Sequence, residues 1–156
     1  MTKKEVAIIL SEYRRKCSIY DKKLFALCKL RYEMQGLKGF DYSAIRVQGG
    51  ESENVIERLI DKEIELSKVV QQALIDKTTS YEYAMKIIYL LPNKDNDCDI
   101  LADIYLLGKS YGETAKNYNY DINSLWNKVG IAKKKLSELT EELGLKFENF
   151  YFYEEK

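Results

Sequence analysis

The sequence predicts an all-α protein, in which a long N-terminal helical hairpin precedes a C-terminal helix-turn-helix. Apolar residues recur at spacings of three and four in nearly every segment outside residues 36–50. Four of the eight glycines lie within residues 36–50, and Pro92 is the one proline, so few points interrupt a helix. We expect a hairpin and oligomerisation region at 1–91, a helix-turn-helix region at 92–143 and an aromatic tail at 144–156.

The first helix should begin at Thr2, whose hydroxyl can cap it. Nine basic and four acidic residues give residues 1–35 a net charge of +5. The basic side chains off the apolar seam form either a solvated face or a contact with DNA or a partner. The seam is longer than a hairpin needs, which favours a homodimer. Its members are Val6, Leu10, Tyr13, Cys17, Tyr20, Leu24, Leu27, Arg31 and Met34.

Residues 36–50 should form a connector that packs on the helices, because too many of its residues are apolar for a linker. A second helix should begin near Ser52. Residues 51–77 hold seven acids and four bases, so an antiparallel pairing with the basic first helix is favourable. Thr79 and Glu82 stand at capping-box spacing, so this helix either restarts there or continues unbroken to Leu91.

Residues 98–143 read as three short helices. Ile100, Leu101, Ile104, Tyr105 and Leu107 supply the packing of the first, and Gly108 ends it. Ser110 can cap a second helix over residues 111–118. Asn119 then tolerates the positive φ of a tight turn, and Asp121 can cap the third helix. That helix has an apolar stripe at Leu125, Val129, Ala132, Leu136, Leu139 and Leu143.

The third helix is the one expected to contact DNA. Its face opposite the stripe carries amides and a lysine, which suit base edges and phosphates respectively. From Tyr105 to Leu136 six lysines stand against two acids, a local net charge of +4 in a chain that is neutral overall. The same geometry also occurs in helical domains that bind no DNA. The candidate DNA-binding residues are Ser110, Asn123, Ser124, Trp126, Asn127, Lys128, Lys133 and Lys134.

The composition argues against several other functions. The chain has no histidine, no phosphate-binding loop and no cysteine beside a base, so we expect no enzyme, no cofactor and no metal site. Cys17, Cys28 and Cys98 are interpreted as small core residues. No apolar run reaches membrane-spanning length and no signal peptide is indicated, so we expect a cytoplasmic protein. The aromatic residues from Phe147 to Tyr153 either dock on the helices or bind a partner.

The segments LKGFDYSAIRVQGGESENVIERLIDKEIEL and IYLLGKSYGETAKNYNYDINSLWNKVGIAKKKLSEL resemble phage and prophage late-transcription regulators of the ArpU and RinA type. The C-terminal part of that family is similar to the region-four helix-turn-helix of bacterial sigma factors. Tyr105 and Gly108 match the family's R-Y-x-x-G stretch, and residues 110–115 match its S-x-x-E-I-A stretch, with Thr114 in place of isoleucine. Residues 119–121 match its turn and cap.

The resemblance implies a phage-encoded regulator that binds double-stranded DNA, controls phage genes in the cytoplasm of a bacterial host and has no enzymatic activity. A second hypothesis stays open. In it the protein binds host RNA polymerase, a repressor or a defence protein, and keeps the helix-turn-helix as a scaffold. The aromatic tail and the neutral overall charge favour this second hypothesis, whereas the local charge of +4 favours the first.

Overall fold

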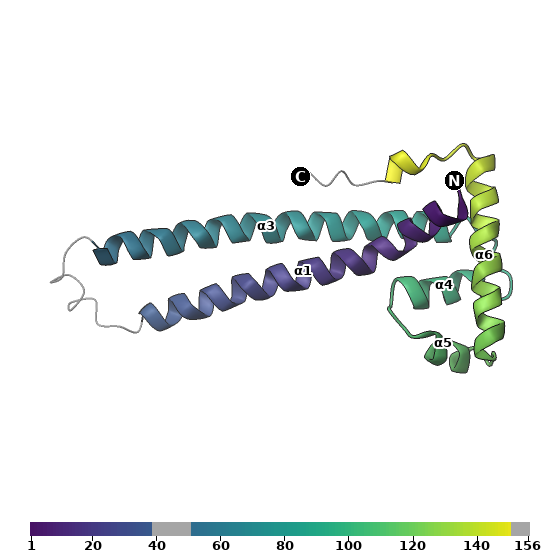
Figure 1. Cartoon of the computed structure of the whole chain (residues 1–156), viewed down its shortest axis with the longest axis horizontal. Coiled ribbons are helices and arrows are strands. Elements are labelled where there is room, and N and C mark those ends of the chain that lie inside the picture. The colour runs from purple at the N-terminus through teal and green to yellow at the C-terminus, as the bar shows by residue number, and fades with distance from the viewer. Residues whose placement is uncertain (39–50, 151–156) are drawn as a thin grey trace. The chain divides into compact units, whose positions relative to one another are not determined.

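The computed structural model describes the backbone of residues 1–38 and 51–150 and the side chains of residues 1–36 and 55–150. Within those residues the fold is all-α, as the sequence predicts, and contains no strand. The helices are α1 (Lys3–Lys38), α3 (Glu51–Ile88), α4 (Asp97–Tyr105), α5 (Tyr111–Asn117) and α6 (Ile122–Glu142), followed by the 3-10 helix η1 (Phe147–Phe150) (Figure 1). The predicted packing of the connector, the possible cap by the Ser52 side chain and the docking of Tyr151–Tyr153 lie outside the described residues.

The predicted N-terminal hairpin is confirmed: α1 and α3 run side by side in opposite directions (Figure 1). A capping box begins α1, because Thr2 N–H donates to Glu5 Oε2 (2.7 Å) and Glu5 N–H donates to Thr2 Oγ1 (3.2 Å). α3 passes through Thr79 without a break, so the unbroken alternative is the correct one. The buried Ser80 allows this continuation, since its hydroxyl donates to the Lys77 carbonyl within the helix (2.8 Å).

The chain forms two compact units, Ser18–Ile75 and Met1–Cys17 with Asp76–Lys156. The unit Ser18–Ile75 contains the C-terminal part of α1 and the N-terminal part of α3. Its buried apolar side chains are Leu27 and Leu30 of α1 and Val70 and Ala73 of α3. Arg31 Nε donates to Glu63 Oε1 at 3.0 Å, which joins the two seams. That pair is half-exposed, so it contributes at most about 1 kcal/mol and the apolar seam dominates.

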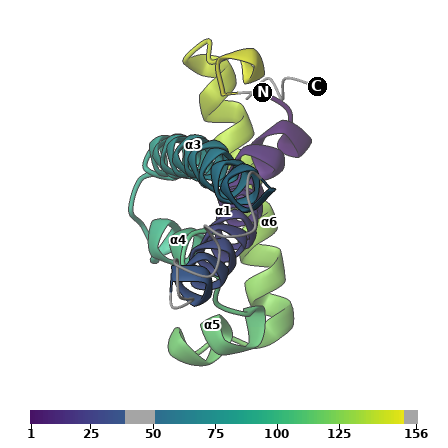
Figure 2. The same cartoon turned by 90° about the vertical axis from the view of Figure 1, so that its left-hand side faces the viewer.

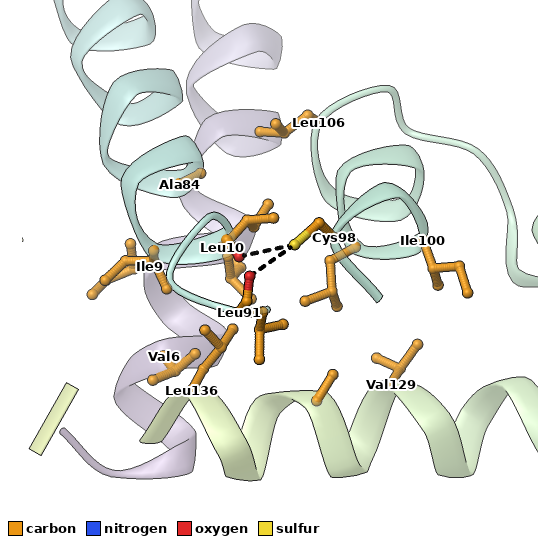
Figure 3. Packing of buried hydrophobic residues seen from close by; sticks show 14 of the residues in the cluster. Val6, Ile9, Leu10, Ala84, Leu91, Cys98, Ile100, Leu106, Val129 and Leu136 are labelled. Atoms are coloured by element: carbon orange, nitrogen blue, oxygen red, sulfur yellow. Dashed lines mark hydrogen bonds between the residues drawn. The ribbon is translucent and has the colours of Figure 1, made fainter. Parts of the chain in front are cut away.

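The second unit has one core, drawn in part in Figure 3. The first turns of α1, the last turns of α3 and all the C-terminal helices contribute to it. Val6, Ile9 and Leu10 of α1 are buried in the same cluster as Leu136 of α6. The Cys98 thiol donates to the carbonyls of Ile88 (3.5 Å) and Leu91 (3.4 Å), and α4 is thereby fixed to the end of α3. The first turns of α1 therefore belong to the core on which α6 rests. The remaining members are Ala84, Ile87, Ile88, Ile100, Leu101, Leu106, Ala115, Leu125, Val129, Ala132 and Phe150.

Two predicted core positions are wrong at helix ends. Leu107 is exposed and Leu106 is buried instead, because α4 ends at Tyr105 and the helical spacing no longer applies. Leu143 is 59% exposed because it is the C-cap of α6, and Thr140 is buried in its place. The Thr140 hydroxyl donates to the Ser137 carbonyl (2.9 Å), which satisfies its hydrogen-bonding capacity inside the core.

The end of α6 has the geometry of a glycine cap. Gly144 has a φ of 66°, its N–H donates to Glu141 (3.1 Å), and the Leu145 N–H donates to Thr140 (2.9 Å), the pattern of a Schellman motif. The chain then returns to the core, where Phe150 is buried and packs edge-on against Tyr83 at 5.2 Å between ring centroids. Docking of the aromatic tail is thus confirmed as far as Phe150.

Of the three cysteines, Cys98 is buried, Cys17 is partly buried and Cys28 is exposed, so the core interpretation is wrong for Cys28. Cys28 lies on α1 between the buried Leu27 and the exposed Lys29, at a position that points away from the seam. Among the described residues no helix is both long enough and apolar enough to cross a membrane.

Candidate nucleic-acid interface

The orientation of α6 is set by α5 and the short turn that follows it. Ser110 caps α5, since its hydroxyl accepts from the Glu113 N–H (3.1 Å), as the sequence predicts. Asn119 has the expected positive φ, 58°. The Tyr120 N–H then donates back to the Ala115 carbonyl (2.8 Å) and closes the turn. Asp121 is the N-cap of α6, although its carboxylate makes no cap hydrogen bond.

The inner faces of α5 and α6 pack closely, and Figure 2 shows α5 beside the first turns of α6. Thr114 and Ala115 of α5 are buried, as are Leu125 and Val129 of α6. Thr114 tolerates burial because its hydroxyl donates to the Ser110 carbonyl (2.9 Å). This packing fixes which side of α6 faces solvent.

The solvent-facing side of α6 carries Asn123, Asn127 and Lys134, all exposed. At about 100° per residue they fall within a sector of about 40°, opposite the buried stripe. Ser124 is exposed beside this sector. We call Asn123, Asn127 and Lys134 the outer face of α6.

Gly130 lies on the outer face between Asn127 and Lys134. A Cβ at this position would lie 3.7 Å from Nζ of Lys3, so the lysine ammonium group occupies the space above the glycine. The N-terminus is held there, because Ser137 Oγ donates to the Met1 carbonyl at 2.6 Å. Lys3 thus adds a positive charge that sequence reasoning missed, and no local pattern could have indicated it, since 127 residues separate the two positions.

Lys128 and Lys133 lie on the flanks of α6 and are partly buried. Lys128 Nζ lies 3.2 Å from Asp97 Oδ1 and 5.3 Å from the Tyr120 ring centroid. Burial lowers the pKa of Lys128, but hydrogen bonds to Asp97 and Tyr120 outweigh it and the net shift is upward. Lys133 Nζ lies 5.2 Å from the Tyr105 ring centroid. Both lysines therefore connect helices, and a contact of either with DNA stays a prediction.

Trp126 lies on the same flank of α6 as Lys133, where its ring stacks on Tyr111 at 4.4 Å between centroids and 7° between planes. It is nevertheless 56% exposed. Ile122, one turn earlier on α6, is also exposed, so Tyr111 is the ring against which Trp126 packs. Burial raises the pKa of both Tyr105 and Tyr111. Tyr105, Tyr111 and Trp126 thus join α4, α5 and α6.

The net charge of +4, counted along the sequence from Tyr105 to Leu136, does not describe the charges that surround α6 in the folded chain. Lys128 pairs with Asp97, and Lys109 lies 3.6 Å from Asp103, so two acids that precede the counted segment cancel two of its lysines. Two cations from α1 replace them. One is Lys3, and the other is Arg14, whose guanidinium lies against Gly108. Within the described residues, Lys134 and Lys135 make no ion pair.

Tyr118 fixes the end of α5 to α4, because its hydroxyl donates to Asp103 Oδ2 at 3.0 Å. Burial, together with this hydrogen bond and the negative charge of Asp103, raises the pKa of Tyr118 from 10.0 to about 12. The hydroxyl group therefore stabilises the fold fully below about pH 10, and that contribution is lost as the pH rises toward 12.

Tyr118→Phe should lower the free energy of unfolding by about 1 kcal/mol at pH 7, because a hydrogen bond to a carboxylate is lost. The variant should also lose less stability than the wild type between pH 10 and 12. Denaturant unfolding across that range measures both effects, with Tyr89→Phe, an exposed tyrosine on the turn after α3, as the control. Parallel stability profiles for Tyr118→Phe and the wild type would contradict the assignment.

Comparison of the chain with known protein families, with curated proteins and with solved structures finds no match.

Proposed function

We propose that this protein is a transcriptional regulator that binds double-stranded DNA, with α5 and α6 acting as a helix-turn-helix and α6 as the recognition helix. The observation that carries the proposal is the outer face of α6, where two amide side chains and an unpaired lysine are exposed together. The resemblance to phage late-transcription regulators supports phage genes as the targets.

The dimensions and chemistry of the outer face suit the major groove. Asn123 and Lys134 are eleven residues apart, about 16 Å along the helix axis, and the groove is about 12 Å wide and admits one helix. An asparagine can bond an adenine edge through both atoms of its amide group. Gly130 presents no side chain between them, and the Lys3 ammonium group lies above it, so a positive charge stands between Asn127 and Lys134 on this face.

The charges beside this face suit the phosphate backbone. Lys134 and Lys135 extend from α6, and Lys3 reaches the same helix from α1. Phosphate contacts of this kind set the position of a recognition helix and make binding dependent on salt, whereas they do not distinguish base sequences. In this proposal the asparagines therefore provide specificity and the lysines provide affinity.

Asn127→Ala should weaken binding to a preferred duplex by about 1 to 3 kcal/mol and relax the preference at one base pair. Lys134→Ala should weaken binding to all duplexes alike and reduce the slope of log affinity against log salt by about one. Fluorescence anisotropy at several salt concentrations measures both, after a selection from random duplexes has supplied the preferred sequence.

Asn149→Ala and Lys146→Ala are matched controls, since both residues are exposed and both follow the end of α6. They should bind as the wild type does. Unchanged affinity in both Asn127→Ala and Lys134→Ala, with thermal melting showing an intact fold, would refute the proposal.

The second candidate function is binding of a protein, such as host RNA polymerase. Ile122, Trp126 and Ile131 are large apolar residues of α6 that remain exposed, which favours a protein contact at this helix. Trp126→Ala distinguishes the two functions when the wild type is tested against duplex DNA and against the polymerase. Loss of polymerase binding with unchanged DNA binding would support this candidate.

A further inference from the structure

Among the described residues of the unit Ser18–Ile75, seven large apolar side chains remain exposed after its seam is filled. They are Phe25 (71% exposed) and Tyr32 (78%) on α1, and Val55 (50%), Ile60 (44%), Ile64 (51%), Leu74 (45%) and Ile75 (58%) on α3. The buried apolar side chains of this unit are Leu27, Leu30, Val70 and Ala73. This part of the hairpin thus exposes more large apolar side chains than it buries apolar ones, which is unusual for two helices that meet no further partner.

Helix phase places six of these side chains at the same sense of rotation from the seam, which is one side of the hairpin, and Val55 at the opposite sense. The angles are measured about each helix axis, in the sense in which the side chains rotate as residue number increases. On α1, Phe25 and Tyr32 project about 140° to 160° from the direction of Leu27. On α3, Ile60 and Ile64 lie about 80° to 120° beyond Val70 in the same direction. Because the two helices are antiparallel, equal rotation away from the seam leads to the same side. We call this side of the hairpin the apolar face.

The other side of the hairpin is charged. Glu33 of α1 and Arg58, Lys62 and Glu65 of α3 are exposed and lie at the opposite rotation from the seam. The apolar face also carries polar residues, because Asp21, Glu57, Lys68 and Gln71 fall within the same sectors. This difference between the two sides is typical of a hairpin that is covered on one of them.

Charge indicates what covers the apolar face. Residues 18–38 hold five bases and two acids, and residues 51–75 hold six acids and three bases, so the two helical segments carry +3 and −3. If a second copy packs on the face by rotation about an axis parallel to the helices, α1 of each copy lies against α3 of the other. Opposite charges then flank the apolar contact, whereas a perpendicular axis would place α1 against α1.

The available area is sufficient for such a dimer. Residues 18–38 span about 30 Å of helix, and two helices side by side present a face about 20 Å wide. Each copy would therefore cover about 600 Å², or about 1,200 Å² in total, which reaches the range of stable interfaces.

We propose that a second copy of this chain packs on the apolar face, so that two hairpins form an antiparallel four-helix bundle whose twofold axis runs parallel to the helices. The seam from Val6 to Met34, from which the sequence predicts a dimer, pairs α1 with α3 within one chain. The intermolecular contact instead centres on Ile60 and Ile64 of α3. Phe25 and Tyr32 of α1 project nearly opposite the seam and lie at the edge of the contact. This dimer does not depend on whether α6 binds DNA.

Sedimentation equilibrium of the full chain tests the proposal. The wild type should dimerise at micromolar concentration, and Ile64→Glu should weaken the dimer at least tenfold, because a charge replaces a contact that excludes water. Ala26→Glu is the matched control, since Ala26 is an exposed residue of the same hairpin placed away from the apolar face, and it should dimerise like the wild type.

Ile64→Ser provides a milder substitution, and far-UV circular dichroism verifies that each variant remains helical. Lowering the ionic strength should strengthen the wild-type dimer, because opposite charges flank the contact. A monomeric wild type at high micromolar concentration would overturn the proposal. A dimer that tolerates Ile64→Glu and Ile64→Ser would overturn it equally, because the contact would then lie elsewhere.

Discussion

Leu136→Ala should lower the free energy of unfolding by about 2 to 5 kcal/mol, the cost of removing a buried leucine side chain and leaving a cavity. Leu136 is fully buried on α6, in the cluster to which α1 and α4 also contribute (Figure 3). A loss of this size is a large part of the 5 to 15 kcal/mol that typically stabilises a domain. Denaturant unfolding of the full chain measures it.

Leu143→Ala is the matched control, because the sequence places Leu136 and Leu143 on the same stripe whereas the structure separates them. Leu143 is exposed at the end of α6, so its replacement should change the free energy of unfolding by less than about 0.5 kcal/mol. Equal losses in the two variants would mean that the stripe continues to Leu143 and that the described end of α6 is wrong.

The combined replacement of Val6, Ile9 and Leu10 by alanine should unfold α4, α5 and α6, although all three residues lie near the N-terminus. Each is buried in the core on which α6 rests. Summed losses of about 5 kcal/mol or more approach the whole stability of a domain. For the same reason residues 92–143 should not fold as an isolated fragment.

Amide hydrogen exchange measures this second effect, since the backbone amides of α6 should lose their protection in the triple variant. Ile8→Ala is the control, because Ile8 lies between the replaced residues on the same helix but is exposed. Protection of α6 that survives the triple substitution would show that the C-terminal helices fold without α1.

Local features of the fold could be predicted from the sequence because their causes are local. The Ser110 cap and the positive φ of Asn119 each depend on residues within one helical turn. The continuity of α3 through Thr79 could not be decided in this way. A capping box and a helix interior use the same residues, and the buried position of Ser80 depends on the packing around it.

The residues of the outer face could be predicted from the sequence, whereas the contacts of the charged residues around it could not. Periodicity alone places Asn123, Asn127 and Lys134 opposite the buried stripe. By contrast, the pairing of Lys128 with Asp97 depends on how α4 meets α6. The approach of Lys3 to Gly130 likewise depends on how the first turn of α1 meets that helix. Such contacts join residues far apart in the chain, and a count of charges along a segment does not contain them.

The central claim is that the outer face of α6 reads duplex DNA. The most direct measurement is the affinity of the wild type for a duplex selected from a random pool, compared with its affinity for a scrambled duplex of the same length at physiological salt. The proposed function predicts at least a thousandfold preference for the selected duplex, and a loss of about 1 to 3 kcal/mol of that preference in Asn127→Ala. Equal affinity of the wild type for the two duplexes, or a preference unchanged in Asn127→Ala, would contradict it.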